Sequence, residues 1–336
     1  MIVAYPIIGP VGAALCQVAR SAVDIVLHLG AHRTGSTSFQ AYMRDNSAEL
    51  AHWGIGFWGP HRIRKGMFAG IMPRPGFGAA ASQLNRAKGR ISLQVAQAES
   101  RGRHTLIVSE ENMMGSIRDN LRTGSLYPAV GERMARYAAA MTGRASKIML
   151  SVRSLDHHWS SVASFAVARG QPMPRSDHWG RIATTRRSWR DVIADLACAV
   201  PDAEIRVFPF ECFAGRPSDM LAAGADCYAP AAAGQSWLNR SPSLPKLRHV
   251  LRERGDRFGD LPTGEGRWSP FDARQTAALR ELYAEDMHWL YAGADGLATL
   301  IEDPARTQEN KMGVPQMTGN RGRPNAIKER AMARPG

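Results

Sequence analysis

The sequence has few of the features that build disulfide scaffolds, metal sites or membrane spans. Its 336 residues include four cysteines (Cys16, Cys198, Cys212 and Cys227), and none belongs to a C-x-x-C pair or lies at metal-ligand spacing from a histidine. This usage argues against a disulfide framework and a zinc site, and it favours a reducing compartment. No window offers the roughly 20 uninterrupted apolar residues that a membrane-spanning helix needs. We therefore expect a cytoplasmic globular protein that holds no metal ion and does not span a membrane.

The N-terminus also lacks the basic start of a secretory signal. Residues 1–22 are apolar, but Pro6, Gly9 and Pro10 interrupt them. A signal peptide would carry positive charge ahead of an unbroken apolar stretch. We interpret residues 1–22 as an apolar extension that precedes the globular domain.

Acidic residues are scarce, and the resulting positive charge is unevenly distributed. The chain holds 43 Lys and Arg against 30 Asp and Glu, a net charge of +13. Residues 60–103 contribute +8, since nine basic residues face Glu99 alone, and residues 304–336 contribute +5. The basic residues of 60–103 and 304–336 are not interleaved with aromatic residues and form no recognition motif. A nucleic-acid-binding protein is therefore a weaker interpretation than an enzyme with an anionic ligand. The tail, 304–336, is polar and rich in Pro and Gly, and we expect it to be disordered.

Apolar runs rich in β-branched residues alternate with helical patterns along the chain. We predict strands at 24–29, 104–109, 146–152 and 204–210, and helices at about 36–50, 127–143, 156–169 and 186–199. A helical C-terminal part follows, with its clearest helix at 274–291. This alternation predicts one α/β domain over residues 23–303, with three layers and a central parallel sheet flanked by helices. Ligands of such sheets bind beyond the carboxyl ends of the strands.

A turn rich in Gly, Ser and Thr follows the first predicted strand. The segment "HLGAHRTGSTSFQ" (28–40) places Gly30 four residues before Gly35-Ser36-Thr37, which nearly spells the phosphate-binding loop of nucleoside triphosphatases. Those proteins carry lysine where this chain has Ser36, and the cation inside the loop is Arg33. Backbone N–H groups around Thr34–Thr37 would converge on an anion at the start of the next helix. The loop therefore predicts a P-loop-like anion site without the usual lysine.

The loop resembles the phosphosulfate-binding loop of sulfotransferases that use 3′-phosphoadenosine 5′-phosphosulfate (PAPS), in the bacterial type that reads H-x-T-G-x-T-S. In that family the loop cation precedes Thr-Gly and is usually lysine, so arginine is a departure. The resemblance implies that the donor is bound by the loop residues Arg33, Thr34, Gly35, Ser36, Thr37 and Ser38. It also implies a fold of the P-loop-like α/β type.

Two further segments are similar to motifs of the same family. The family places an arginine at a strand end and a serine eight residues later to bind the 3′-phosphate, and Arg153 and Ser161 match this spacing. A guanidinium fork and a hydroxyl suit a phosphate chemically. The segment "NRSPS" (239–243) is similar to the family's N-x-S-x-S, which places Asn239 and Arg240 near the nucleotide unless they form only a turn. The matched segments cover about 50 residues, but their order and spacing extend over residues 27–246.

Transfer of a sulfuryl group to a hydroxyl requires a base near the acceptor. The segment "SEEN" (109–112) follows the second predicted strand, and its similarity to a family segment makes Glu111 the first candidate and Glu110 the second. His32, inside the loop, is the competing base. Arg33 would act electrostatically, because a guanidinium does not readily give up its proton. No metal ion is required.

The resemblance implies an enzyme, a PAPS-dependent sulfotransferase that acts on a hydroxyl of a carbohydrate or glycolipid-type acceptor. We expect the basic segment 60–103 to bind the acceptor and the acceptor to be anionic. Trp53, Phe57 and Trp58 are interpreted either as core residues or as platforms for sugar rings. Two other readings stay open: a P-loop nucleotide phosphotransferase or hydrolase, and a sulfotransferase homologue that binds the nucleotide without turnover because of Arg33.

Overall fold

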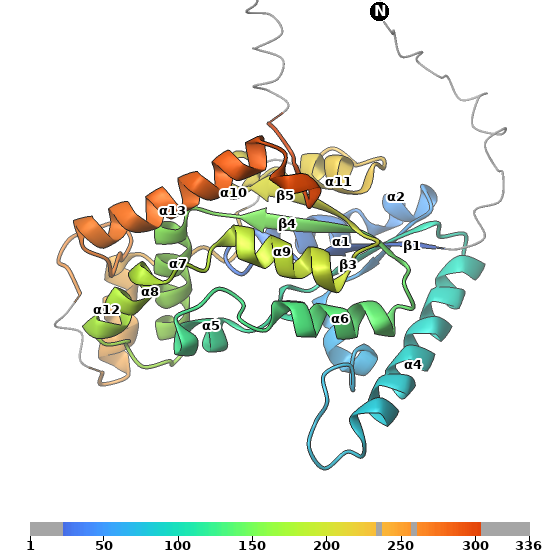
Figure 1. The fold of residues 1–336 in the computed structure, drawn as a ribbon, viewed down its shortest axis with the longest axis horizontal. Coiled ribbons are helices and arrows are strands. Elements are labelled where there is room, and N and C mark those ends of the chain that lie inside the picture. Colours follow the sequence, from blue (N-terminus) through green and yellow to red (C-terminus); the bar gives the residue numbers. More distant parts are fainter. Residues whose placement is uncertain (1–22, 233–236, 257–260, 304–336) are drawn as a thin grey trace, which may run out of the picture. The chain divides into compact units, whose positions relative to one another are not determined.

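The computed structural model describes residues 23–232, 237–256 and 261–303 (Figure 1). The predicted apolar extension (1–22) and basic tail (304–336) lie outside the described residues. The described residues from Val23 to Ile301 belong to one compact unit. Within the described ranges, no helix combines the length and the apolar character that crossing a bilayer demands.

Six parallel strands form a single sheet in the order β2-β3-β1-β4-β5-β6. The strands are β1 (Asp24–His28), β2 (Ile55–Trp58), β3 (Thr105–Ser109), β4 (Ala145–Val152), β5 (Glu204–Pro209) and β6 (Thr299–Leu300). The four predicted strands are confirmed as β1, β3, β4 and β5. From β1 the chain builds the sheet first toward β2 and β3 and then toward β4, β5 and β6. This change of direction beside β1 makes its carboxyl end the expected ligand position.

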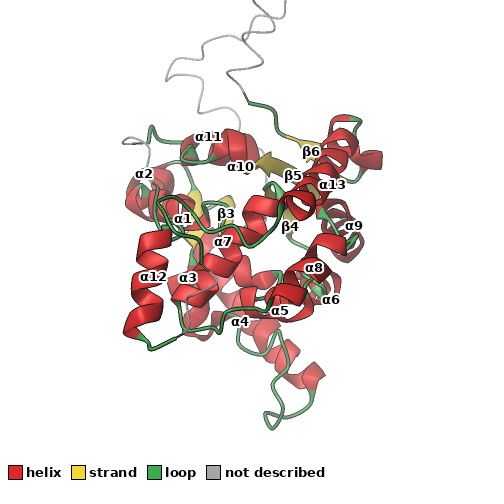
Figure 2. Ribbon diagram, turned by 90° about the vertical axis from the view of Figure 1, so that its left-hand side faces the viewer, coloured by secondary structure: helices red, strands yellow, loops and turns green. Residues whose placement is uncertain are grey.

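Helices cover both faces of the sheet (Figure 2). Ile25 and Leu27 of β1 belong to one apolar cluster and Val26 to another, because successive strand residues point to opposite faces. The first cluster includes residues of α4 (Ala80–Ser100), α6 (Val130–Ala140), α7 (Leu155–Ala168), α8 (Ser176–Thr184), α9 (Trp189–Ala199), α12 (Leu244–Glu253) and α13 (Ala273–Tyr291). The second includes residues of α1 (Ser36–Asp45), α2 (Ser47–His52), α10 (Phe210–Phe213) and α11 (Pro217–Ala225). This arrangement confirms the α/β class and is compatible with three layers.

Several elements differ from the prediction. The helix expected at 36–50 is two helices, α1 and α2, because the chain leaves helical geometry at Asn46. Edge strands β2 and β6 were not predicted. Trp58 is buried in β2 and Phe57 packs against the second cluster, whereas Trp53 is exposed and stacks on Tyr228 with ring centroids 4.7 Å apart. Residues 60–103 are mostly helical, with α3 (Pro60–Arg62), a π-helical turn η2 (Ile63–Met67) and α4.

A buried carboxylate joins α13 to α9. Asp286 accepts hydrogen bonds from the Ser188 hydroxyl (2.5 Å) and from the backbone N–H groups of Trp189 (2.9 Å) and Arg190 (3.3 Å). These bonds satisfy donors at the start of α9 that have no intrahelical acceptor. The buried Trp189 then donates its indole N–H to the carbonyl oxygen of Arg153 (2.7 Å), just beyond β4. Arg153, the residue that follows β4, is therefore fixed by α9, which in turn is fixed by Asp286 of α13.

We predict that Asp286→Ala lowers the free energy of unfolding by about 2 kcal/mol or more, because it leaves buried donors without their charged acceptor. Urea denaturation measures this change as a lower midpoint. The neighbouring exposed residue provides the control, since Glu285→Ala should change the free energy by less than about 0.5 kcal/mol. Equal effects of the two variants would contradict the role of the Asp286 cap.

Candidate functional site

A cavity of about 520 Å³ opens at the carboxyl ends of the central strands. Its lining comes from segments that follow the strands: 32–40 after β1, 111–118 after β3, residues of 153–169 after β4 and 210–215 after β5. Pro60 and Arg64 after β2, residues 237–241 and Arg267 complete it. The cavity therefore lies where a parallel sheet with this strand order places its ligand.

The turn between β1 and α1 leaves the start of α1 open to the cavity. Gly30 has a φ of 57°, and a Cβ atom there would lie 2.3 Å from Ser36 Oγ, so a larger residue does not fit. Thr34 Oγ1 accepts from the N–H of Ala31 (2.9 Å) and donates to its carbonyl oxygen (2.7 Å), which closes the turn. No side chain of the described residues caps α1 after Gly35. The first N–H groups of α1 and the helix dipole thus form an anion-binding point.

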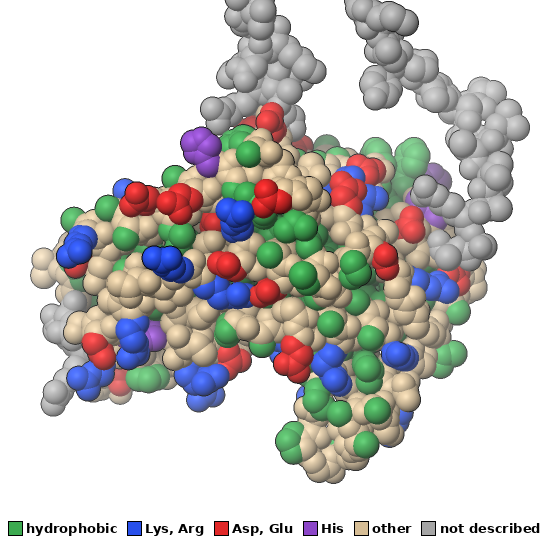
Figure 3. All heavy atoms as spheres, in the orientation of Figure 1, with side chains coloured by type: hydrophobic (Ala, Val, Ile, Leu, Met, Phe, Trp, Pro, Cys, Tyr) green, Lys and Arg blue, Asp and Glu red, His purple; other side chains and the backbone are tan. Residues whose placement is uncertain are grey.

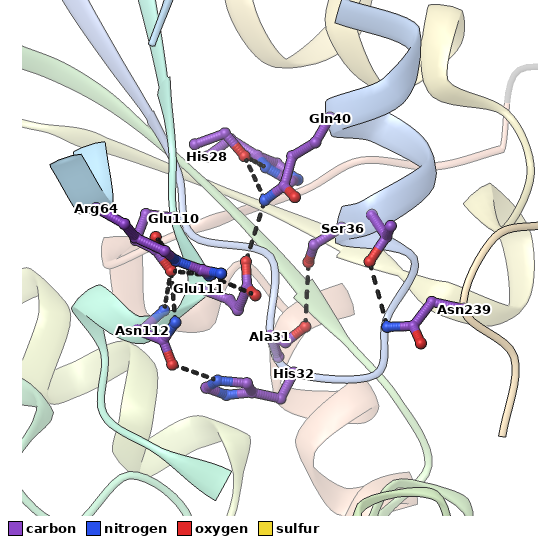
Figure 4. Close-up of polar contacts among 12 residues, drawn as sticks. His28, Ala31, His32, Ser36, Gln40, Arg64, Glu110, Glu111, Asn112 and Asn239 are labelled. Atoms are coloured by element: carbon purple, nitrogen blue, oxygen red, sulfur yellow. Dashed lines mark hydrogen bonds and ion pairs between the residues drawn. The ribbon is translucent and has the colours of Figure 1, made fainter. Parts of the chain in front are cut away.

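The sequence-predicted loop residues do not all face the cavity. Gly35, Ser36, Thr37 and Ser38 line it, whereas Thr34 is buried within the turn. Ser38 Oγ accepts from the backbone N–H of Leu238 (3.0 Å), and Thr37 Oγ1 accepts from Asn239 Nδ2 (3.5 Å; Figure 4). These bonds bring residues 238 and 239 against the start of α1. Asn239 and Arg240 therefore join the loop in the cavity wall.

Arginine dominates the cavity. Seven arginines line it: Arg33, Arg64, Arg118, Arg153, Arg169, Arg240 and Arg267. Glu111 is the one carboxylate among the described lining residues. The side chains of Arg118, Arg169 and Arg267 form no hydrogen bond or ion pair with any part of the chain that the structure describes. Such uncompensated positive charge favours an anionic ligand.

Arg33 reaches across the cavity from a strained backbone position. Its φ of 68° lies in the left-handed region, which costs an L-residue about 1 kcal/mol or more. The guanidinium lies 4.4 Å from the centroid of the Phe165 ring, and Nε donates to Ser161 Oγ (3.2 Å). Nη2 donates to the carbonyl oxygen of Asn239 (2.8 Å) and to Ser241 Oγ (3.1 Å). Arg33 therefore joins the loop to two segments far away in the sequence.

The arginines around Arg33 all lower the pKa of its guanidinium. Burial, followed by repulsion from Arg153, Arg169 and Arg267, lowers the pKa of the Arg33 guanidinium to about 10. The group stays charged at neutral pH. A set of like charges that disfavours its own protonation is relieved when an anion binds among its members.

The predicted residues Arg153 and Ser161 both line this cavity. Arg153 is buried, its guanidinium lies 4.4 Å from the Phe210 ring centroid, and Nη1 donates to the carbonyl oxygen of Arg33 (3.2 Å). Its Nε is a buried donor with no acceptor in the described structure. The hydroxyls of Ser161 and Ser241 lie 2.6 Å apart. The guanidinium and the two hydroxyls supply hydrogen-bond donors for a second anion-binding point in the same cavity.

A chain of hydrogen bonds lies on the opposite wall (Figure 4). Glu110 is buried and accepts from Nε and Nη2 of Arg64, both at 2.7 Å, in a bidentate fork. It also accepts from Asn112 Nδ2 (2.6 Å), and Asn112 Oδ1 lies 3.3 Å from His32 Nε2. Glu110 does not line the cavity. It therefore positions Arg64 and Asn112 and is unsuited to act as the base.

The same chain engages both ring nitrogens of His32. The Tyr127 hydroxyl accepts from the backbone N–H of His32 (2.8 Å) and donates its own proton to Nδ1 (2.9 Å). This network assigns the ring proton to Nε2, which donates to Asn112. Burial is the main cause that lowers the pKa of His32. Neutral and fully hydrogen-bonded, His32 has no lone pair left for an acceptor hydroxyl.

Glu111 is the ionised group that faces the cavity. Its Oε2 accepts from Gln40 Nε2 (3.1 Å), and Oε1 accepts from Arg64 Nη2 (3.3 Å). Burial pushes the pKa of Glu111 upward, but hydrogen bonds from the backbone and from Gln40, with the positive charge of Arg64, leave it below its ordinary value. The carboxylate is therefore ionised at neutral pH. Of the three predicted bases, Glu111 alone combines an available lone pair with access to the cavity.

The basic segment 60–103 contributes less to this site than expected. Pro60 and Arg64 are its members that line the cavity, and Arg64 is neutralised by its ion pair with Glu110. Three of its arginines, Arg62, Arg101 and Arg103, line a separate cavity of about 230 Å³ beside the edge strand β2. This difference arises because the longest element of the segment, α4, packs on one face of the sheet, away from the strand ends.

Several site residues were missed by sequence reasoning. Gln40 lies one helical turn after Ser36, and this spacing could have placed it on the same face of α1. Arg64 was missed because it follows β2, a strand that the sequence analysis did not predict. Tyr127 and Arg267 reach the site from loops that carry no motif, so no local signal indicates them.

The search for metal ligands and the comparison with known proteins give no further indication of function. Among the described residues, no three His, Cys, Asp or Glu side chains are grouped so that they could hold a metal ion, and Cys198 and Cys227 are free thiols. No protein-family model matches the chain, and no curated protein sequence matches it. The function must therefore be inferred from the site.

We predict that Tyr127→Phe lowers the free energy of unfolding by about 1–3 kcal/mol, because it leaves the N–H and Nδ1 of His32 without a buried partner. It should also change the nitrogen chemical shifts of the His32 ring, which NMR detects. Tyr137→Phe is the matched control, because Tyr137 is also a buried residue but its hydroxyl forms no hydrogen bond with a described residue. A Tyr127→Phe spectrum with unchanged His32 resonances would contradict the assigned network.

Proposed function

We propose that the chain is a PAPS-dependent sulfotransferase, which moves a sulfuryl group from 3′-phosphoadenosine 5′-phosphosulfate to a hydroxyl of a carbohydrate or glycolipid-type acceptor. One observation carries this proposal. The cavity combines two anion-binding points, the uncapped start of α1 and the Arg153–Ser161 pair, with a single ionised carboxylate, Glu111. A donor with two separate phosphate groups and an acceptor that must lose a proton match this arrangement.

The residues present fit the donor. Backbone N–H groups at the start of α1, with the hydroxyls of Ser36 and Thr37, would bind the 5′-phosphosulfate. Arg153, Ser161 and the Arg33 guanidinium beside them would bind the 3′-phosphate, and the free Nε of Arg153 would gain its missing acceptor. The rings of Phe210 and Trp237, with centroids 6.1 Å apart, both line the cavity and offer faces on which an adenine base can stack.

The chemistry assigned to the chain is positioning, charge stabilisation and removal of one proton. The donor supplies an activated sulfuryl group, whose S–O bond to the 5′-phosphate breaks as a new S–O bond to the acceptor oxygen forms. Glu111 accepts the proton of the acceptor hydroxyl and then releases it to solvent. The start of α1 and the charge of Arg33 stabilise the negative charge that develops on the leaving phosphate. Gln40 and Arg64 hold Glu111 in place for this step.

The structure offers less support for a nucleotide phosphotransferase or hydrolase. Such enzymes need a lysine at the position of Ser36 and a carboxylate near the phosphates to hold magnesium. Glu111, bonded to Gln40 and Arg64, is the one carboxylate lining the described part of the cavity. The sulfotransferase therefore accounts for more of the lining residues.

Calorimetry with adenosine 3′,5′-bisphosphate, the product of the donor, tests the donor site. We predict micromolar or tighter binding that weakens about 10- to 150-fold in Arg153→Ala, the range expected for a lost charge-assisted hydrogen bond. Arg153→Lys keeps the charge but loses the fork, so it should recover only part of the affinity.

The control for this experiment is Arg274→Ala, which removes an exposed arginine outside the cavity and should leave binding unchanged. ATP with magnesium is titrated in parallel. Tighter binding of ATP–magnesium than of the bisphosphate would overturn the sulfotransferase proposal and favour the phosphotransferase.

Glu111→Gln tests the base. We predict a loss of transfer rate of about 10²- to 10⁴-fold, measured with radiolabelled donor and a panel of neutral and acidic oligosaccharides. Because the pKa of Glu111 lies below its ordinary value of 4.5, the wild-type rate should fall only as the pH drops below that value. Glu285→Gln is the surface control. Full activity of Glu111→Gln together with loss in His32→Gln would instead make His32 the base.

A further inference from the structure

A second basic cavity shares a lining residue with the first. Its volume is about 440 Å³, and it lies between α5 (Ile117–Thr123), α8 and residues 171–175. Arg118 of α5 lines both cavities. The two cavities therefore meet at this residue, which places a second group of arginines next to the cavity that Glu111 lines.

The second cavity is lined by arginines that are held in place but weakly neutralised. Arg118, Arg122, Arg175 and Arg181 face it, against the single carboxylate of Asp177. Arg175 and Arg181 share Asp177 at 3.7 and 3.8 Å, and all three side chains are exposed. Exposed pairs at such distances contribute little free energy, so these arginines are available to a ligand.

Two contacts shape this surface further. Arg181 Nη2 lies 3.0 Å from Nδ1 of the buried His178, which orients one guanidinium toward the cavity. Arg122 pairs with Asp119 at 3.3 Å on the exposed side of α5. In Figure 3, the Lys and Arg side chains at the end of the molecule near α5 and α8 are interspersed with Asp and Glu side chains. Arg122, Arg175 and Arg181 extend the positive lining of the second cavity beyond Arg118.

We propose that the acceptor is a linear acidic oligosaccharide, whose reacting hydroxyl lies at Glu111 and whose next anionic group lies among Arg122, Arg175 and Arg181. This inference rests on the proposed sulfotransferase function and names its acceptor class. Carboxylate or sulfate groups repeated along a sugar chain suit arginine forks placed at successive positions. The acceptor chain is bound by α5 and α8.

An acidic peptide is the alternative occupant of this surface, because arginine clusters also recognise acidic motifs in peptides. The second cavity lies among helices and a loop, whereas the edge strands of the described sheet are β2 and β6, so a peptide would not bind here as an added strand. The sugar chain is preferred because the proposed function takes a carbohydrate hydroxyl as its acceptor. The test therefore includes an acidic peptide.

Binding of defined oligosaccharides tests the proposal. The probes are a short and a longer oligomer of alternating glucuronic acid and N-acetylglucosamine, a neutral N-acetylglucosamine oligomer and a tyrosine-containing polyglutamate of matched charge. Calorimetry is performed with adenosine 3′,5′-bisphosphate present. We expect the longer acidic oligosaccharide to bind tightest, and Arg122→Ala/Arg181→Ala to weaken its binding about tenfold or more.

The matched control is Arg186→Ala/Arg274→Ala, which removes two exposed arginines that line neither cavity. It should change the affinity less than about twofold, and neither double variant should change binding of the bisphosphate. Equal loss in both double variants, or equal binding of the neutral oligomer, would overturn the proposal, and tighter binding of the peptide would replace the acceptor class. Oligosaccharide binding as expected without any binding of the bisphosphate would instead overturn the sulfotransferase itself.

Discussion

Repulsion among arginines that the fold holds together is the constraint on which the site depends. Arg33, Arg153, Arg169 and Arg267 converge from four separate segments on one half-buried volume, and burial with this repulsion lowers the pKa of Arg33. No carboxylate of the described chain enters this part of the cavity to neutralise them. The fold therefore holds charges whose partner must come from outside, and an anion that binds here stabilises the folded state in proportion to its affinity.

The rest of the structure holds these charges in position. Phe165 packs against both Arg33 and Arg169, and Phe210 packs against Arg153, so the flat guanidinium faces are covered while their edges stay free for hydrogen bonds. The Asp286–Trp189 link fixes the backbone at the end of β4. On the opposite wall, Arg64 contacts Glu111, but its positive charge is paired with the carboxylate of Glu110. The cavity is thus divided into a strongly positive half and a half in which charge is balanced.

The central sheet was predictable because its strands are buried on both faces and read as continuous apolar runs. The loop at Gly30–Ser38 and the Arg153–Ser161 pair were found because local motifs mark them, and both lie in the same cavity. β2 was missed because Phe57 and Trp58 were weighed as core residues or as platforms for sugar rings, and not as part of an edge strand. Tyr127 and Arg267 have no local signal at all. Their positions depend on tertiary packing, which only the folded chain reveals.

The left-handed backbone of Arg33 also affects how this protein can change. Glycine would relieve the strain at that position, but it would remove a guanidinium that contacts two segments far away in the sequence. Selection for higher stability alone would therefore favour Arg33→Gly, although this substitution damages the site. The strained backbone of Arg33 lowers the stability of the folded chain, and in return the cavity keeps the positive charge of the guanidinium.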